Sequence, residues 1–238
     1  MKLFIALVLT FPLAAFTATA FAQAPQPPEI AARQYILVDL ASNQVLAERD
    51  ADSQADPASL TKLMTAYLVF NAIRDKKLTL EQTLTVSKRA WSERVGGGSL
   101  MFIDTTMTPK VSELLRGMIV QSGNDASVAL AEGVAGSVEA FVAMMNRQAQ
   151  AWGLKNTQFK NVAGLSEAGH YSSTRDVATV AARIISEHPD FYALYSLRQY
   201  TYNNIKQDNR NMLLGRDATV DGMKTGYTDA AGYCLIAS

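Results

Sequence analysis

The order of strand-like and helix-like segments most constrains how this chain folds. Residues 34–40 and 45–47 are rich in aromatic and β-branched side chains on either side of a short polar turn, which predicts a β-hairpin. Helical spacing of apolar residues follows through the middle of the chain, and strand character returns over residues 218–224 and 232–237. Two strands, a block of helices and two more strands predict an α+β fold in which an antiparallel sheet carries a helical insert.

The helical block divides into several segments. The first helix begins at Ser59 and is closed by the polar run 74–77. Residues 79–108 lack periodicity, and three glycines at 96–98 lack the spacing of a phosphate loop, so we interpret this part as a mobile surface loop near the functional site. The later helices are expected at residues 111–120, 126–135 and 137–152, and from Ser173, with Asp176 at the capping-box position, to just before Pro189.

The N-terminus has the pattern of a secretory signal. Lys2 precedes a mainly apolar run, and small residues at 22 and 24 give a signal-peptidase site, so we expect cleavage after Ala24. Pro12 interrupts the apolar run and argues against a membrane anchor. We therefore predict a signal peptide over residues 1–24, a proline-rich linker over 25–33, and one sizeable domain over 34–238.

The composition excludes several classes of function. The chain has 22 basic and 22 acidic residues, which gives no electrostatic case for a nucleic-acid partner. Cys234 is the only cysteine, so an intrachain disulfide is impossible, and its apolar surroundings in the sequence predict a buried, inert thiol. The only histidines, His170 and His188, leave almost no ligands for zinc, and we expect neither a metal nor a cofactor.

Three short motifs stand in a fixed order along the chain. They are Ser59-Leu60-Thr61-Lys62, Ser122-Gly123-Asn124 and Lys224-Thr225-Gly226. On a helix, Ser59 and Lys62 share a face, so the amine can reach the hydroxyl. A serine hydroxyl needs a base, and lysine can serve when burial and a second cation, here Lys224, depress its pKa.

The second motif falls between two helical patterns and predicts a tight turn. We expect the Ser122 hydroxyl beside Lys62, as a proton relay to the leaving amine of the substrate, and the Asn124 amide against the peptide groups of the substrate.

The third motif is expected on a strand. Lys224 would supply positive charge, the Thr225 hydroxyl would bind a carboxylate, and Gly226 would let a substrate backbone lie against the strand edge. Each motif alone also fits an ordinary helix start, turn or strand end, but the three together favour an acyl-transfer site.

With these motifs, the chain resembles the low-molecular-mass penicillin-binding proteins, in particular the D-alanyl-D-alanine carboxypeptidases of the serine peptidase S11 group. The likeness runs from about Gln34 to the last residue and includes residues 56–62, 121–126, 153–157 and 220–229. The resemblance implies a β-lactamase/transpeptidase-like fold. It also implies a periplasmic hydrolase that removes the terminal D-alanine from peptidoglycan pentapeptides and is inhibited by β-lactams.

The resemblance further implies individual roles. Ser59 would be acylated with Lys62 as general base, and the backbone N–H groups of Ser59 and Tyr227 would form the oxyanion hole. Arg210 matches a position near the substrate carboxylate. Relatives often carry histidine where this chain has Tyr227, and because the backbone N–H acts there, we expect tuning of the activity and not its loss.

In the family fold the catalytic domain continues with a strand and a C-terminal helix, and the strand lies between the N-terminal hairpin and the strands bearing Lys224. Many members add a small β-domain and an amphipathic membrane-anchoring helix. None of this follows Ser238, so we expect a C-terminally incomplete catalytic domain with unpaired strand edges, poorly folded or inactive alone. Membrane contact, at the outer face of the inner membrane, would require that absent anchor.

Three alternatives stay open. A DD-endopeptidase of the same fold would cut crosslinks instead of stem termini. A class A β-lactamase would need a carboxylate that activates the deacylating water, and the region of Glu167 carries no convincing version of that motif. An inactive cell-wall-binding fragment would not need the intact Ser59, Lys62, Ser122 and Lys224.

Overall fold

The structure, a computed structural model, describes residues 27–238, so the predicted signal peptide and its cleavage site lie outside the described residues. Every helix and strand assigned in the described residues belongs to the unit formed by residues 32–238. The strands are β1 (Tyr35–Asp39), β2 (Gln44–Arg49), β3 (Gln199–Tyr202), β4 (Ile205–Asp208), β5 (Met223–Thr228) and β6 (Gly232–Ala237). The helices are α1 (Lys62–Arg74), α2 (Lys88–Ser92), α3 (Val111–Val120), α4 (Asn124–Ala135), α5 (Val138–Ala151), α6 (Thr174–Glu187) and α7 (Pro189–Tyr192), with single 3₁₀ turns η1 (Ala58–Thr61), η2 (Glu93–Gly96), η3 (Ala193–Ser196) and η4 (Met212–Gly215).

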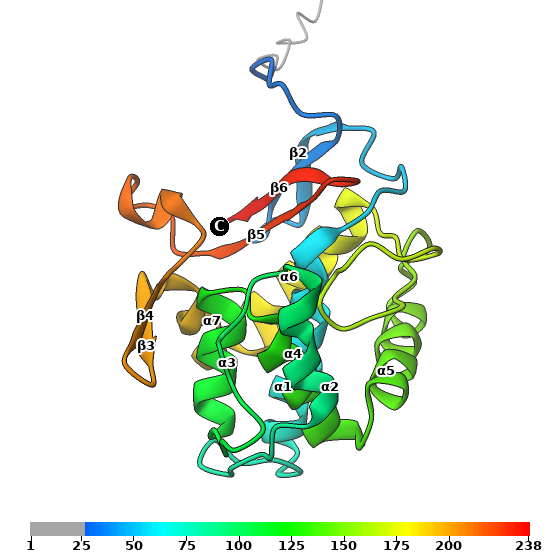
Figure 1. Cartoon of the computed structure of the whole chain (residues 1–238). Helices are drawn as coiled ribbons and strands as arrows, with labels where there is room; N and C mark the ends of the chain where they lie inside the picture. The colour runs from blue at the N-terminus through cyan, green and yellow to red at the C-terminus, as the bar shows by residue number, and fades with distance from the viewer. Residues whose placement is uncertain (1–26) are drawn as a thin grey trace, which may run out of the picture. The chain divides into compact units, whose positions relative to one another are not determined.

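Helix α1 is the centre of the core. It contacts α3, α4, α5 and α6, which surround it (Figure 1). Because its side chains are apolar on nearly every face, it is buried over almost its whole length, as expected of a helix without a polar face. The N-terminal end of α1 continues from η1, which contacts β5. The core therefore fixes the position of Ser59 and Lys62 against that strand.

The strands form three antiparallel hairpins, β1–β2, β3–β4 and β5–β6. In the β5–β6 hairpin, Lys224 lies opposite Ile236 and Gly226 lies opposite Cys234. Within residues 27–238 the β1–β2 and β5–β6 hairpins form no strand pairing with each other, which matches the unpaired edges expected from the sequence.

Most of the predicted elements are confirmed, and α3 and β6 have the expected bounds. The predicted strand over residues 218–224 is wrong in its start, since β5 begins at Met223. The Asp217 carboxylate accepts hydrogen bonds from the backbone N–H and the hydroxyl of Thr219, and these local bonds hold a turn where a strand was expected.

The sequence did not predict the short helices α2 and α7 or the β3–β4 hairpin. The tight turn of that hairpin is made by Asn203 and Asn204, both at positive φ, a known signature of two-residue hairpin turns. At the start of α6 the Ser173 side chain caps the helix, but the Asp176 carboxylate does not complete the predicted capping box. It instead accepts from the Asn156 N–H and the Thr157 hydroxyl.

No single helix in residues 27–238 is long and apolar enough to cross a membrane. Helices α4 and α5 satisfy the length and composition criteria only as a pair, and that pair is bent by 83°.

Candidate active site

Ser59 and Lys62 meet at the junction of η1 and α1. The Lys62 Nζ lies 2.9 Å from the Ser59 Oγ and donates a second hydrogen bond of 2.7 Å to the carbonyl oxygen of Ala163. Only 2% of Lys62 is exposed, whereas Ser59 faces a cavity. The predicted contact between hydroxyl and amine is therefore present in the structure.

The surroundings of Lys62 favour its neutral form. Burial lowers the pKa of Lys62 well below its usual value, and the nearby Lys224 ammonium lowers it further, while the carboxyls of Glu93 and Asp125 act in the opposite direction. These are the two causes expected from the sequence. A neutral amine within hydrogen-bond distance of a serine hydroxyl can accept its proton.

Ser122 lies in a tight turn before α4, with φ at 68°, and is almost fully buried. Its hydroxyl accepts a 2.9 Å hydrogen bond from the Nζ of Lys224, which also donates to the Thr225 carbonyl at 2.8 Å. The sequence placed Ser122 beside Lys62, but both hydrogen bonds of the Lys62 amine go to Ser59 and Ala163. The structure thus pairs each serine with its own lysine.

Burial, followed by the nearby Arg210 guanidinium, lowers the pKa of Lys224 to about 7. The two lysines therefore differ: the pKa of Lys62 is depressed far below its usual range, and Lys224 changes charge near neutral pH.

The glycine-rich segment is held against the start of α4. The two Asp125 carboxylate oxygens accept from the backbone N–H groups of Met101 and Ile103 at 2.8 and 3.1 Å. The Asn124 N–H donates to the Ser99 carbonyl at 2.8 Å. The segment lies next to the site, as predicted, because Gly97, Gly98 and Ser99 line the cavity. Its predicted mobility stays a prediction.

Two glycines from distant parts of the chain enclose η1. A Cβ on Gly226 would lie 3.0 Å from the Ser59 nitrogen, and one on Gly164, whose φ is +87°, would overlap the Ala58 carbonyl. Among the described residues the Ser59 N–H has no hydrogen-bond partner. A donor therefore stays available beside the edge of β5.

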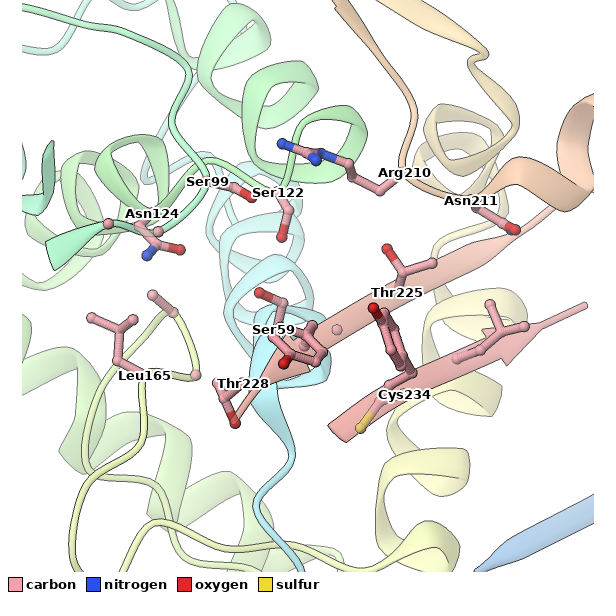
Figure 2. Close-up of a pocket in the computed structure, with 18 of the residues that line it drawn as sticks. Ser59, Ser99, Ser122, Asn124, Leu165, Arg210, Asn211, Thr225, Thr228 and Cys234 are labelled. Carbon is pink, nitrogen blue, oxygen red and sulfur yellow. The ribbon is translucent and has the colours of Figure 1, made fainter. Parts of the chain in front are cut away.

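These elements enclose a cavity of about 600 Å³. Figure 2 shows the Ser59, Ser122 and Thr225 side chains around its middle, Arg210 and Asn211 toward one end, and Leu165 and Thr228 toward the other. Of the predicted site residues, those lining the cavity are Ser59, Ser122, Asn124, Arg210, Thr225, Gly226 and Tyr227. Lys62 and Lys224 are buried behind the two serines to which they donate.

Cys234 corrects one expectation. It is half-buried and lines the cavity, because β6 lies beside β5 with Cys234 opposite Gly226. Burial raises the pKa of its thiol, which agrees with the predicted low reactivity. In residues 27–238 no three His, Cys, Asp or Glu side chains gather in a way that could hold a metal ion.

The sequence reasoning missed the turn that carries Ala163. The Asn161 Oδ1 accepts the N–H groups of Ala163, Gly164 and Leu165, and this fixes the direction of the Ala163 carbonyl that accepts from Lys62. The only signal was an asparagine three residues before a glycine, which marks a turn but not its partner.

Comparison with known proteins supports the family that the three motifs indicated. The family model described as D-alanyl-D-alanine carboxypeptidase, peptidase S11, matches residues 21–238. The chain belongs to this family. The resemblance inferred from the motifs is thereby confirmed.

Among curated S11 relatives, the D-alanyl-D-alanine carboxypeptidases DacC and DacA of Escherichia coli K12 are 46% and 47% identical over 94% and 90% of this chain. These alignments cover 57% and 54% of the two relatives, so the chain spans a little over half of their length. The crystal structure of penicillin binding protein 5 from Haemophilus influenzae matches with a TM-score of 0.87 at 45% identity, over 90% of this chain and 62% of that one. The fold is therefore that of the penicillin-binding proteins.

Proposed function

We propose that this chain carries the active site of a serine-type D-alanyl-D-alanine carboxypeptidase with Ser59 as nucleophile. The main support is the 2.9 Å contact between the Ser59 hydroxyl and a lysine amine whose burial favours the neutral form. The family membership and the cavity beside β5 support the same reaction class.

In the acylation step, Lys62 takes the Ser59 proton while the Ser59 oxygen attacks the carbonyl of the penultimate D-alanine. The backbone N–H groups of Ser59 and Tyr227 would stabilise the oxyanion, and the free Ser59 N–H beside Gly226 is the observation that favours this site. The bond to the terminal D-alanine then breaks.

The leaving amine needs a proton. The Ser122 hydroxyl would supply it and be reprotonated by Lys224, its hydrogen-bond donor at 2.9 Å. A pKa of about 7 suits Lys224 to both giving and regaining a proton near neutral pH. The proton on Lys62 then passes to Lys224, so Lys62 is again neutral and can activate the water that releases the acyl group.

The substrate would lie along the edge of β5. Its terminal carboxylate would bind the Thr225 hydroxyl and the Arg210 guanidinium, and its backbone would pass close to Gly226, near the Asn124 amide. A peptidoglycan stem pentapeptide fits this arrangement. A β-lactam presents an amide and a carboxylate in similar positions and would acylate Ser59. Because the N-terminus has the sequence pattern of a secretory signal, we propose that the protein lies in the periplasm.

Fluorescent penicillin labelling tests this proposal. We expect one penicillin bound covalently per folded protein, a result that would overturn the expectation that this chain is poorly folded or inactive alone. We expect no labelling of Ser59→Ala at unchanged thermal stability. Ser186→Ala, on the exposed side of α6, is the matched control and should label normally. Release of D-alanine from a pentapeptide, compared with cleavage of a crosslinked dimer, separates carboxypeptidase from endopeptidase activity. A folded protein that is not labelled would contradict the proposal.

A further inference from the structure

The mechanism above leaves a buried histidine unused. His170 is 5% exposed and directly precedes Tyr171 and Ser172, which form backbone bridges to Gln158 and Ala55, respectively. Its Nε2 lies 2.9 Å from the Thr61 hydroxyl, and its Nδ1 lies 3.0 Å from the backbone nitrogen of Lys160. Both ring nitrogens are therefore engaged.

These two partners determine the tautomer. The Lys160 N–H can only donate, so the Nδ1 of His170 must be the unprotonated nitrogen. The ring proton of the neutral imidazole then lies on Nε2 and is donated to the Thr61 hydroxyl. A second proton on Nδ1 would face the Lys160 N–H and break that bond.

The two partners also belong to the two sides of the Lys62 amine. Thr61 is the last residue of η1 and directly precedes Lys62. Lys160 directly precedes Asn161, whose side chain sets the turn that presents the Ala163 carbonyl. Since that carbonyl accepts from Lys62 at 2.7 Å, His170 joins the segment that carries the base to the segment that holds its amine in place.

We propose that His170, as a neutral imidazole, is a positioning residue for the general base Lys62. The catalytic part of this inference rests on the function proposed above, whereas the hydrogen-bond geometry does not. His170 touches no reacting atom. Its effect passes through Thr61 on one side and the Ala163 carbonyl on the other.

The charges around His170 allow the neutral form. The carboxyls of Asp56, just before η1, and of Glu167 favour protonation of the His170 ring. The centroid of the Phe159 ring lies 6.0 Å from that of the His170 ring. Burial outweighs the two carboxyls and lowers the pKa of His170 below its usual value. The pH must therefore fall below the range in which histidines usually titrate before His170 is protonated and its hydrogen bond with the Lys160 N–H breaks.

Nitrogen NMR of the histidine side chains tests the geometry without reference to activity. The chain has only two histidines, and His188, whose Nε2 lies 3.0 Å from the Asn71 Oδ1, is an internal reference. We expect His170 at neutral pH to show an unprotonated Nδ1 and a protonated Nε2. A protonated Nδ1 would overturn the proposal.

A variant series tests the catalytic consequence. His170→Asn keeps an acceptor near the position of Nδ1 and loses the bond to Thr61, and Thr61→Val removes the same bond from the other side. We expect both to slow penicillin acylation about tenfold or more, because small displacements of a catalytic group reduce rates steeply. Thr61→Ser keeps the hydroxyl and should stay within about threefold of the wild type.

The pH profile separates positioning from simple loss of stability. Loosening the Ala163 turn admits water to Lys62 and raises its pKa, so the acid limb of acylation should move to higher pH in His170→Asn and Thr61→Val. His188→Asn, the matched control, should leave that limb unchanged even if it lowers the melting temperature. If His170→Asn and Thr61→Val are folded, acylate at the wild-type rate and keep the acid limb of the pH profile in place, the positioning role is overturned. A wild-type protein with the expected tautomer but no penicillin labelling would overturn the proposed function, and with it the catalytic part of this inference.

Discussion

The two halves of the site are built in different ways. One half comes from the helical region and contains Ser59, Lys62, Ser122 and Asn124; the other comes from β5 and contains Lys224, Thr225, Gly226 and Tyr227. In the helical half, Lys62, Ser122 and Asn124 are almost fully buried, whereas Tyr227 in the strand half is 55% exposed. Lys224 in the strand half is also buried, at 3% exposed. Under the proposed function the helical half supplies the nucleophile and its buried base, and the strand half supplies a second buried proton carrier and the exposed edge along which the substrate would lie.

The two lysines express this difference most clearly. Both lysines are buried. Burial and the charge of Lys224 lower the pKa of Lys62 well below its usual value, whereas burial and the Arg210 guanidinium lower the pKa of Lys224 to about 7. One lysine is thus suited to act as a base, and the other to carry a charge that an arriving carboxylate reinforces. The same residue type performs two tasks because the neighbouring charges differ.

The largest expected effect comes from removing Lys62, the proposed general base. Lys62→Ala should slow penicillin acylation by about 10³-fold, because no other described side chain donates to the Ser59 hydroxyl. Stopped-flow labelling with a fluorescent penicillin measures this rate. Lys88→Ala is the control, since Lys88 stands three residues after Thr85 with the same spacing but lies outside the cavity. If Lys62→Ala and Lys88→Ala slowed acylation to a similar extent, the special role of Lys62 in the helical half would be contradicted.

The charge of the strand half gives the second prediction. The second-order rate constant of acylation should fall as the pH rises through about 7, because Lys224 then loses the proton that helps to bind an anionic substrate. Arg210→Ala removes a neighbouring cation, so the pKa of Lys224 should rise and this alkaline limb should move to higher pH. At neutral pH the variant should also acylate about tenfold more slowly, through weaker carboxylate binding.

The pH profile of the second-order acylation rate measures both effects. Arg216→Ala, an exposed arginine outside the cavity, should change neither. An alkaline limb that stays in place in Arg210→Ala would show that Lys224 does not set it.

The smallest effect is expected at Asp125, behind the helical half. Asp125→Asn turns one of two acceptors into a donor that faces a backbone N–H, of Met101 or of Ile103. We expect the free energy of unfolding to fall by about 2 kcal/mol and acylation to slow only a few-fold. Urea unfolding monitored by circular dichroism measures the first quantity. Asp190→Asn, an exposed acid on α7, should leave it unchanged.

Much of the site followed from local spacing. Ser59 and Lys62 were found because their distance in sequence sets their distance in space, and the motif around Lys224 was found because β5 is a regular strand. The five long helices, α1 and α3 to α6, were predicted for the same reason, since their apolar periodicity reflects burial within one element.

What sequence reasoning missed depends on long-range contacts. Ser122 pairs with Lys224 and not Lys62, a choice that packing makes between residues about a hundred positions apart. The Ala163 carbonyl carries no side-chain signature, so nothing in the sequence marks it as a partner of Lys62. Cys234 is half-buried because the position of β6 beside the cavity, and not its own apolar neighbours, sets its exposure.

The enclosure of η1 by Gly164 and Gly226 has a consequence for how this sequence can vary. Neither glycine makes or breaks a bond, yet each occupies a space that a single methyl group would fill at the expense of the turn carrying Ser59. In a comprehensive mutational scan selected for function, these two positions should tolerate as few replacements as Ser59, the proposed nucleophile. The positions that reject substitution in such a scan would therefore include residues that only make room for the turn carrying Ser59, as well as residues with a chemical role.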